Sequence, residues 1–421
     1  MDYLTLPKIT HSVMAEQIKS PGFQTLCIHG GTQHESQRAH LMPIYASSTY
    51  TFESAEQAIA IFKGDEPGYV YSRWGNPTIT DAEERIARLE TYGIIDASGN
   101  PMQVKAILHA SGMAAITTML LANIKAGQKI ISHYSLYGGM QEMVDKILPD
   151  LGVETIIMDF RDTGKVEDAI RADRSIKLIY IETPANPTIQ CVNIRELSAI
   201  GKKYGLTVCV DNTFATPYLQ QPFRYDVDYV VHSTTKFLNG HGTAIGGVLM
   251  GRDIEKMNTS VTKTHRLLGG NSNAFEAFLL SNGLRTFGLR MERHCANAMQ
   301  VARMLEKHPG VVQVNYLGLE SHPDYKVATE QMKHPGAMMS FELKGGFEAG
   351  IRFINRLKVC TSAVSLGTCD TLVSHPASTT AVGVPREKRL QFGITDGLIR
   401  MSVGIENVED IMGDLAQAIE G

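Results

Sequence analysis

The chain has 421 residues, 43% of them hydrophobic and 20% charged, and a formal net charge of −4. This length suits two globular domains that bury their own cores. No basic tract of five residues occurs, so we expect no nucleic-acid binding. No run reaches the roughly 18 apolar residues of a membrane span, so we expect no membrane association.

The cysteines form no C-x-x-C pair and match no zinc motif, so we expect no metal site. A chain of this size needs no disulfides, and we interpret the thiols as reduced. The first residues, MDYLTLPKITHSVMAEQ, lack the basic and apolar regions of a signal peptide. The sequence therefore predicts a cytoplasmic protein. Its cysteines are Cys27, Cys191, Cys209, Cys295, Cys360 and Cys369.

Residues 1–65 show no strong periodicity, and one short helix is expected near Ile9 to Ile18. Such a segment does not fold alone. We therefore expect an N-terminal arm that lies on the body or on a second subunit.

Residues 66–288 alternate between short apolar runs and helical patterns. This alternation predicts α/β layers around a mainly parallel sheet. Helices are expected over Thr80–Thr91 and Gly112–Ile124. The predicted strands are Val104–His109, Lys129–Ser132, Glu154–Met158, Leu178–Glu182, Thr207–Asp211 and Tyr229–His232.

Residues 289–421 have a different pattern, which predicts a smaller α+β domain at the C-terminus. The expected helices are Arg290–Glu306, one near Phe347–Leu357 and one near Asn407–Ile419, and the expected strands are Val311–Tyr316, Ala337–Leu343 and Leu398–Val403.

Ligands of an open α/β sheet bind beyond the carboxyl ends of its strands. The strand that ends at His109 is followed by Ser111, Gly112 and Met113, which open a helix. Backbone N–H groups at a helix start can bind an anion. Taken alone, the pattern is more typical of a turn with a capping serine.

Two further strands end at Asp211 and just before Lys236. Alone, each residue is more typical of a cap or of a solvated side chain. Together they match the needs of pyridoxal phosphate (PLP), whose aldehyde binds a lysine and whose ring nitrogen pairs with an aspartate. The hydroxyls of Ser233 and Thr235 precede the lysine and can bind the cofactor phosphate.

Two other residues have a functional and a structural interpretation. Tyr137 follows a predicted strand and can either stack on a flat cofactor ring or pack as a half-buried core tyrosine. Arg400 lies inside an apolar strand, where an arginine needs a partner. A substrate carboxylate is one partner, and an ion pair with Asp396 or Glu406 is the other.

The chain resembles the γ-subfamily of fold-type I PLP enzymes, which contains cystathionine synthases and lyases, homocysteine synthases and methionine γ-lyases. The resemblance runs from about Thr25 to Ile419. It implies a large domain with a mainly parallel seven-stranded sheet and a smaller α+β C-terminal domain. The motifs that carry it are residues 71–78 (YSRWGNPT), 182–187 (ETPANP), 211–213 (DNT), 233–236 (STTK), 240–242 (GHG) and 374–378 (SHPAS).

The resemblance also implies roles. Lys236 would hold the cofactor covalently, Asp211 would pair with its ring nitrogen, and Tyr137 would stack on the ring and act as acid or base. Tyr71 and Arg73 would reach the phosphate of a neighbouring subunit's cofactor, which implies dimers that share active sites and form a homotetramer. Further cofactor contacts would come from Ser111, Gly112, Met113, Asn186, Thr213, Ser233 and Thr235, and the substrate would be held by Tyr137, Ser365 and Arg400.

Within the family, residues 293–298, 363–367 and 393–398 look most like methionine γ-lyases. The implied reaction is γ-elimination of L-methionine, or of a related sulfur amino acid, to 2-oxobutanoate, ammonia and methanethiol. Gly139 and Thr243 depart from that pattern: Gly139 is similar to cystathionine synthases and lyases, and Thr243 to O-acetylhomoserine sulfhydrylases. An O-acetylhomoserine sulfhydrylase or cystathionine γ-synthase is therefore the alternative, and a cystathionine γ-lyase is the second. Residues 93–105 form an insertion that we interpret as a hairpin or loop.

Overall fold

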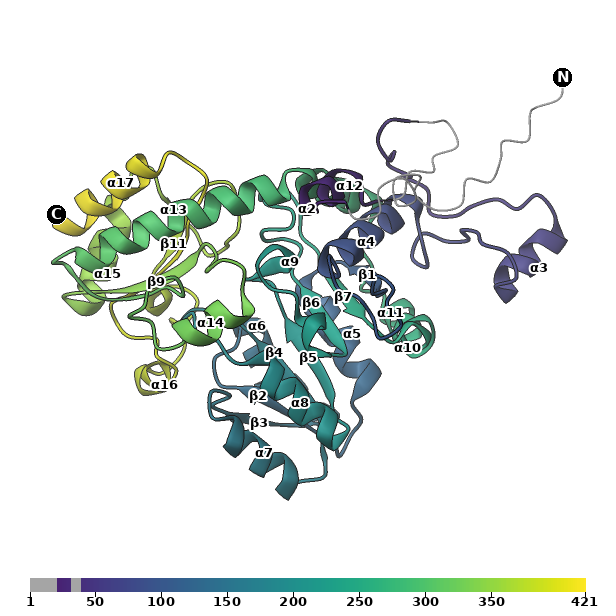
Figure 1. Ribbon diagram of the computed structural model, residues 1–421, viewed down its shortest axis with the longest axis horizontal. Helices are drawn as coiled ribbons and strands as arrows, with labels where there is room; N and C mark the ends of the chain where they lie inside the picture. The colour runs from purple at the N-terminus through teal and green to yellow at the C-terminus, as the bar shows by residue number, and fades with distance from the viewer. Residues whose placement is uncertain (1–20, 32–38) are drawn as a thin grey trace.

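The computed structural model describes residues 21–31 and 39–421, which form a large domain, a smaller C-terminal domain and an N-terminal arm (Figure 1). The helix expected near Ile9 to Ile18 lies outside the described residues. No helix in the described part of the chain has the length and hydrophobicity needed to cross a bilayer.

The large domain contains a seven-stranded sheet in the order β1-β7-β6-β5-β4-β2-β3. Strands β2 to β6 pair in parallel, whereas β7 runs antiparallel to β1 and β6. The mainly parallel seven-stranded sheet is confirmed, although β7 was not predicted as a strand. The strands are β1 (Lys105–His109), β2 (Lys129–His133), β3 (Glu154–Met158), β4 (Ile176–Glu182), β5 (Thr207–Asp211), β6 (Tyr229–His232) and β7 (Gly247–Gly251).

Helices cover both faces of this sheet, which explains why its strands are almost continuously apolar. On one face, Val210 and Val230 belong to a core that includes Ile86 and Leu284. On the other, Val231 and Leu249 pack with Met119 and its neighbours. The first face carries α4 (Pro77–Glu90), α7 (Thr163–Ala172), α8 (Ile194–Tyr204), α9 (Thr216–Leu219) and α12 (Ala274–Arg285). The second carries α5 (Gly112–Asn123) and α6 (Gly138–Glu142), and α11 (Thr262–Leu268), which follows α10 (Ile254–Lys256) in the chain, packs against α5.

The long helix α13 (Phe287–Lys307) runs from the large domain into the C-terminal domain (Figure 1). There a five-stranded sheet, in the order β10-β11-β12-β9-β8, packs against helices through its own core. Its strands are β8 (Val311–Asn315), β9 (Met338–Leu343), β10 (Thr361–Ser362), β11 (Leu372–Ser374) and β12 (Leu398–Ser402), and its helices are α14 (Tyr325–Gln331), α15 (Gly346–Arg356), α16 (Arg386–Gln391) and α17 (Val408–Glu420).

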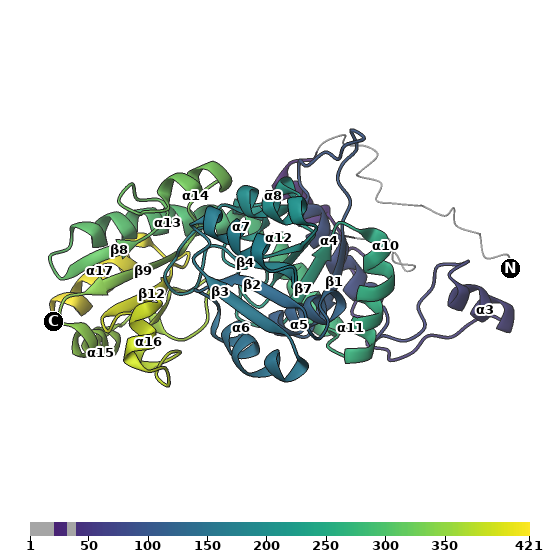
Figure 2. The same cartoon turned by 90° about the horizontal axis from the view of Figure 1, so that it is seen from below.

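The described part of the arm contains two helices that the sequence did not predict, α2 (Phe23–His29) and α3 (Ala55–Lys63). Helix α2 lies on the body, where Phe23 makes edge contacts with Tyr92 and Tyr218. Helix α3 projects away from both domains in two perpendicular views (Figure 1, Figure 2). The exposed fraction of Phe62 on α3 is 61%.

Candidate active site

One pocket opens at the carboxyl ends of β1, β4, β5 and β6, beside the C-terminal domain. It brings together most of the residues singled out in the sequence. Its lining includes Ser111, Gly112, Met113, Tyr137, Glu182, Asn186, Asp211, Thr213, Ser233, Thr235, Lys236, Ile245, Val364, Leu366 and Arg400.

Lys236 extends from the turn after β6 into this pocket. Its Nζ donates a hydrogen bond to the Ser365 hydroxyl at 3.0 Å, so Ser365 joins the site as expected. Burial, and then the charge of Arg400, lower the pKa of the Lys236 ammonium to about 8. A much larger fraction of the amine is therefore neutral near pH 7 than in an ordinary lysine, as a nucleophile or base requires.

Asp211 ends β5, and its carboxylate is held from two sides. Oδ1 accepts the Thr213 N–H at 3.0 Å and the Thr213 hydroxyl at 2.5 Å, and Oδ2 accepts the Tyr180 hydroxyl at 3.3 Å. Burial raises the pKa of Asp211, while the Thr213 hydrogen bonds act in the opposite direction. No lysine or arginine in residues 21–31 and 39–421 forms an ion pair with it, so this carboxylate fits a protonated ring nitrogen.

The start of helix α5 and the turn before Lys236 together form a cradle for an anion. The Ser111 hydroxyl accepts the Ala114 N–H at 3.1 Å and caps the helix. A Cβ atom on Gly112 would come within 3.0 Å of the Ser233 Cβ, a tight contact, so glycine favours the close approach of the two segments. Helix-start N–H groups beside the hydroxyls of Ser233 and Thr235 fit the phosphate of the expected cofactor.

Arg400 on β12 is buried and does not form the ion pair that was its structural interpretation. Asp396 pairs instead with Arg386 and Arg389, and Glu406 accepts the Thr371 hydroxyl. The Arg400 guanidinium donates to the Asn186 side-chain oxygen at 3.2 Å and to the carbonyls of residues 364 and 365. Its Nε–H has no partner among the described residues. Burial lowers the pKa of the guanidinium to about 10, and the cation fits a substrate carboxylate.

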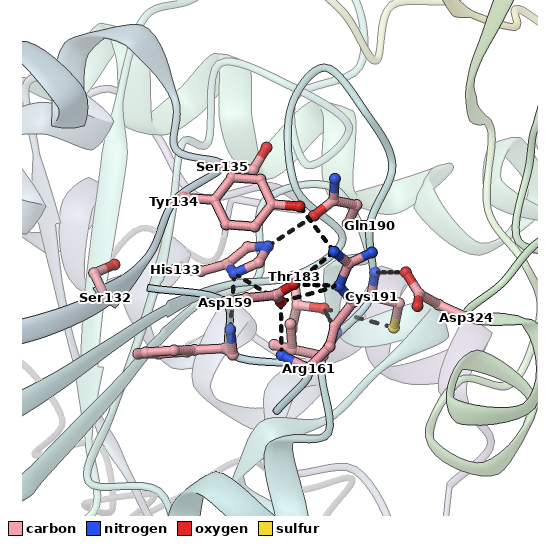
Figure 3. Close-up of polar contacts among 12 residues, drawn as sticks. Ser132, His133, Tyr134, Ser135, Asp159, Arg161, Thr183, Gln190, Cys191 and Asp324 are labelled. Carbon is pink, nitrogen blue, oxygen red and sulfur yellow. Dashed lines mark hydrogen bonds and ion pairs between the residues drawn. The ribbon is translucent and has the colours of Figure 1, made fainter. Parts of the chain in front are cut away.

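Asn186 lies in the loop after β4, and a polar cluster anchors that loop (Figure 3). The His133 ring pairs with the Gln190 side-chain oxygen at 2.9 Å. The Cys191 N–H donates to Asp324 at 2.9 Å, which ties the loop to the segment before α14. The side chain that contacts Arg400 is therefore presented by a loop held at both the sheet and the C-terminal part of the chain.

Tyr137 lies at the start of α6 with its side chain 49% exposed, so it is not a core tyrosine. Its N–H donates to the Glu182 carboxylate at 2.7 Å. The sequence motifs predicted no role for Glu182, although its position at the end of a strand, next to the strand of Asp211, signals a site residue.

Tyr71 and Arg73 do not line the pocket. Arg73 lies near the Tyr71 ring and donates to the backbone carbonyl of Arg266, and Tyr71 is exposed. A single chain thus does not bring these two residues to Lys236. Their expected role in a neighbouring subunit stays a prediction.

Nearly the whole chain is similar to a family of known proteins. The sequence pattern described as "Cys/Met metabolism PLP-dependent enzyme" matches residues 24–420. The L-methionine gamma-lyase of Fusobacterium nucleatum subsp. nucleatum is 44% identical over 405 residues, covering 96% of this chain and 99% of that protein. The cystathionine gamma-lyase of Bacillus subtilis is 39% identical, covering 94% and 99%.

Among solved structures, cystathionine gamma synthase from Xanthomonas oryzae pv. oryzae superposes with a TM-score of 0.87. It is 34% identical, covering 95% of this chain and 98% of that one. A lysine amine, a buried carboxylate and an anion cradle in one pocket agree with the cofactor that the family name states. The chain belongs to the Cys/Met metabolism PLP-dependent enzymes, and its cofactor is pyridoxal phosphate.

Proposed function

We propose that this enzyme catalyses the γ-elimination of L-methionine, or of a related sulfur amino acid, to 2-oxobutanoate, ammonia and methanethiol. The observation that carries the proposal is the character of the pocket wall. Ile245, Val364 and Leu366 offer an apolar surface to a substrate side chain. The carboxylates of the lining, Glu182 and Asp211, already accept hydrogen bonds from the protein. An apolar thioether suits this wall better than the distal charged groups of cystathionine.

In the proposed reaction Arg400 binds the substrate carboxylate, and Asn186 and Ser365 steady that end of the site. PLP, when bound, supplies an electron sink for the charge left at Cα. Lys236 takes the Cα proton, because its lowered pKa leaves the amine free to accept one. Tyr137 would stack on the cofactor ring and move protons near the leaving sulfur. Loss of a Cβ proton then lets methanethiol leave from Cγ, and addition of water gives 2-oxobutanoate and ammonia.

A γ-replacement, as in an O-acetylhomoserine sulfhydrylase or cystathionine γ-synthase, is the second candidate. It is favoured by Gly139, where a Cβ atom would come within 2.6 Å of the Tyr137 ring. A cysteine at this position, as in the pattern of many methionine γ-lyases, would require another placement of that ring. Thr243, which accepts a hydrogen bond from Asn239, is the other departure. Cystathionine γ-lyase activity remains the third candidate.

The proposed assembly is a homotetramer built from dimers, in which Tyr71 and Arg73 of one chain contact the cofactor phosphate bound by the other chain of the dimer. The exposure of Tyr71 and the position of Arg73 beside it, outside the pocket of its own chain, support this arrangement. We also propose a cytoplasmic location, because all six cysteines are unpaired thiols, as expected in a reducing compartment.

A product assay on the PLP-loaded enzyme tests the proposed reaction. Methionine is supplied alone, and O-acetylhomoserine is supplied with sulfide. Release of 2-oxobutanoate and methanethiol from methionine is expected. Homocysteine formation without methionine breakdown would overturn γ-elimination in favour of replacement.

A further inference from the structure

Glu182 is a buried carboxylate of the pocket to which the proposed reaction gives no task. It ends β4 and is paired in register with Asp211 on β5, so two carboxylates stand at adjacent strand ends. Burial first, and then the charge of Asp211, raise the pKa of Glu182 to about 8. This position is costly for a carboxylate, so a side chain retained here needs strong partners.

Those partners are two backbone groups from two different walls of the pocket. One Glu182 oxygen accepts the N–H of Tyr137 at 2.7 Å, at the start of α6. The other accepts the N–H of Asn186 at 3.2 Å, in the loop after β4. Asn186 in turn contacts Arg400 at 3.2 Å. One carboxylate therefore spans the tyrosine wall and the wall that presents the arginine.

We propose that Glu182 is a positioning residue. It fixes Tyr137 and Asn186 relative to the cofactor, so that the cofactor ring and the substrate carboxylate are held in one geometry. Glu182 contacts neither of these two groups itself and acts through the two loops. The loop after β4 is also anchored at Gln190 and Cys191, but the N–H groups of Tyr137 and Asn186 are themselves held by Glu182. A carboxylate with two acceptor oxygens is the one side chain of this length that satisfies both N–H groups at once.

Glutamine is the sharpest replacement, because it has the same shape and no charge. It keeps one acceptor and turns an NH₂ group toward the second N–H, so either Tyr137 or Asn186 loses the hydrogen bond that fixes its backbone. Loss of one hydrogen bond to this buried carboxyl, which leaves the backbone N–H unsatisfied, corresponds to a change of about tenfold in an equilibrium.

The test compares Glu182→Gln with the wild-type holoenzyme in two binding readouts. Cofactor release on dilution is followed by absorbance, and L-norleucine, which has no leaving group, is titrated against the spectrum of the bound cofactor. We expect release to be about tenfold faster and the half-saturating norleucine concentration to rise about tenfold. Glu83→Gln is the matched control, because Glu83 on α4 also accepts a backbone N–H, from Leu108 at 2.8 Å, but does not line the pocket.

The inference rests on the proposed binding site for cofactor and substrate carboxylate, not on which γ-reaction follows. Norleucine binding does not need elimination, so a failed product assay leaves this test intact. Values within twofold of wild type for both readouts in Glu182→Gln would overturn the proposal. So would equal changes in Glu83→Gln.

Amide hydrogen exchange on the wild-type holoenzyme gives a second test that needs no variant. We expect the amides of Tyr137 and Asn186 to exchange slowly, because each donates to the buried carboxylate. Exchange of both amides as fast as in a solvated loop would contradict the positioning role of Glu182, even if Glu182→Gln failed to fold.

Discussion

The strand-end pocket and the segment just before α4 carry parts of the same expected site in different ways. In the pocket, Lys236, Asp211 and Arg400 come from distant parts of the sequence and meet in one space. Tyr71 and Arg73, just before α4, lie together outside that space, and Tyr71 is exposed. The difference teaches that a sheet edge assembles chemistry within one chain, whereas the proposed role of Tyr71 and Arg73 needs a second surface.

Loss of the pocket lysine should have the largest effect. Lys236→Ala should lower kcat/KM by about 10³-fold or more, since both covalent attachment and proton transfer depend on this amine. The melting temperature should stay near that of wild type. Lys203→Ala, which removes an exposed lysine paired with Glu167, is the control and should change activity less than twofold. Comparable losses in both variants would contradict the assignment.

Loss of Arg73 should impair the site that a neighbouring subunit is proposed to share. Arg73→Ala should weaken cofactor retention about 10- to 100-fold, the value of a charge-assisted hydrogen bond to a phosphate. When Lys236→Ala and Arg73→Ala chains are unfolded, mixed and refolded together, about a quarter of wild-type activity should return. Half of the dimers then contain one chain of each variant, and each of these dimers has one intact site out of two. No recovery in verified mixed dimers would rule out shared sites.

The substitution Arg400→Lys tests the role of Arg400 in binding the substrate carboxylate. Lysine keeps the charge but loses the planar fork that binds a carboxylate bidentately. We expect KM for methionine to rise about tenfold with a smaller change in kcat. An equal loss in kcat with unchanged KM would instead assign Arg400 to the chemical step.

The smallest effect is in pH dependence. As the pH is raised toward 8, the neutral fraction of the Lys236 amine should rise, and above pH 8 it should level off, because the pKa of this lysine is lowered to about 8. The rate at which cofactor-depleted enzyme recaptures PLP should follow this curve in stopped-flow absorbance. A rate that climbs steadily to pH 10 would indicate an ordinary lysine.

Much of the large domain could be predicted, because parallel strands buried on both faces are apolar runs with sharp ends. Strands β3, β5 and β6 have the expected bounds. Strand β7 was missed because its run, Gly247–Gly251, begins and ends with glycine. Helices α2 and α3 were missed because they have only 7 and 9 residues, too few to display a clear helical period.

The site shows the same division. Strand ends pointed to Asp211 and Lys236, because the carboxyl edge of a parallel sheet is a physical rule. The sequence could not decide whether Arg400 pairs with a substrate carboxylate or with Asp396, because it does not show that Asp396 forms ion pairs with Arg386 and Arg389. Glu182 received no role, because its bonds are to backbone groups of loops whose course depends on tertiary structure.

The most direct test of the strand-end pocket is to identify which lysine carries the cofactor. Borohydride reduction of the holoenzyme fixes PLP to its lysine, and peptide mass spectrometry locates the added mass. We expect the label on the peptide that contains Lys236 and on no other lysine. A label on another lysine, with Lys236 unmodified, would contradict the account of this pocket.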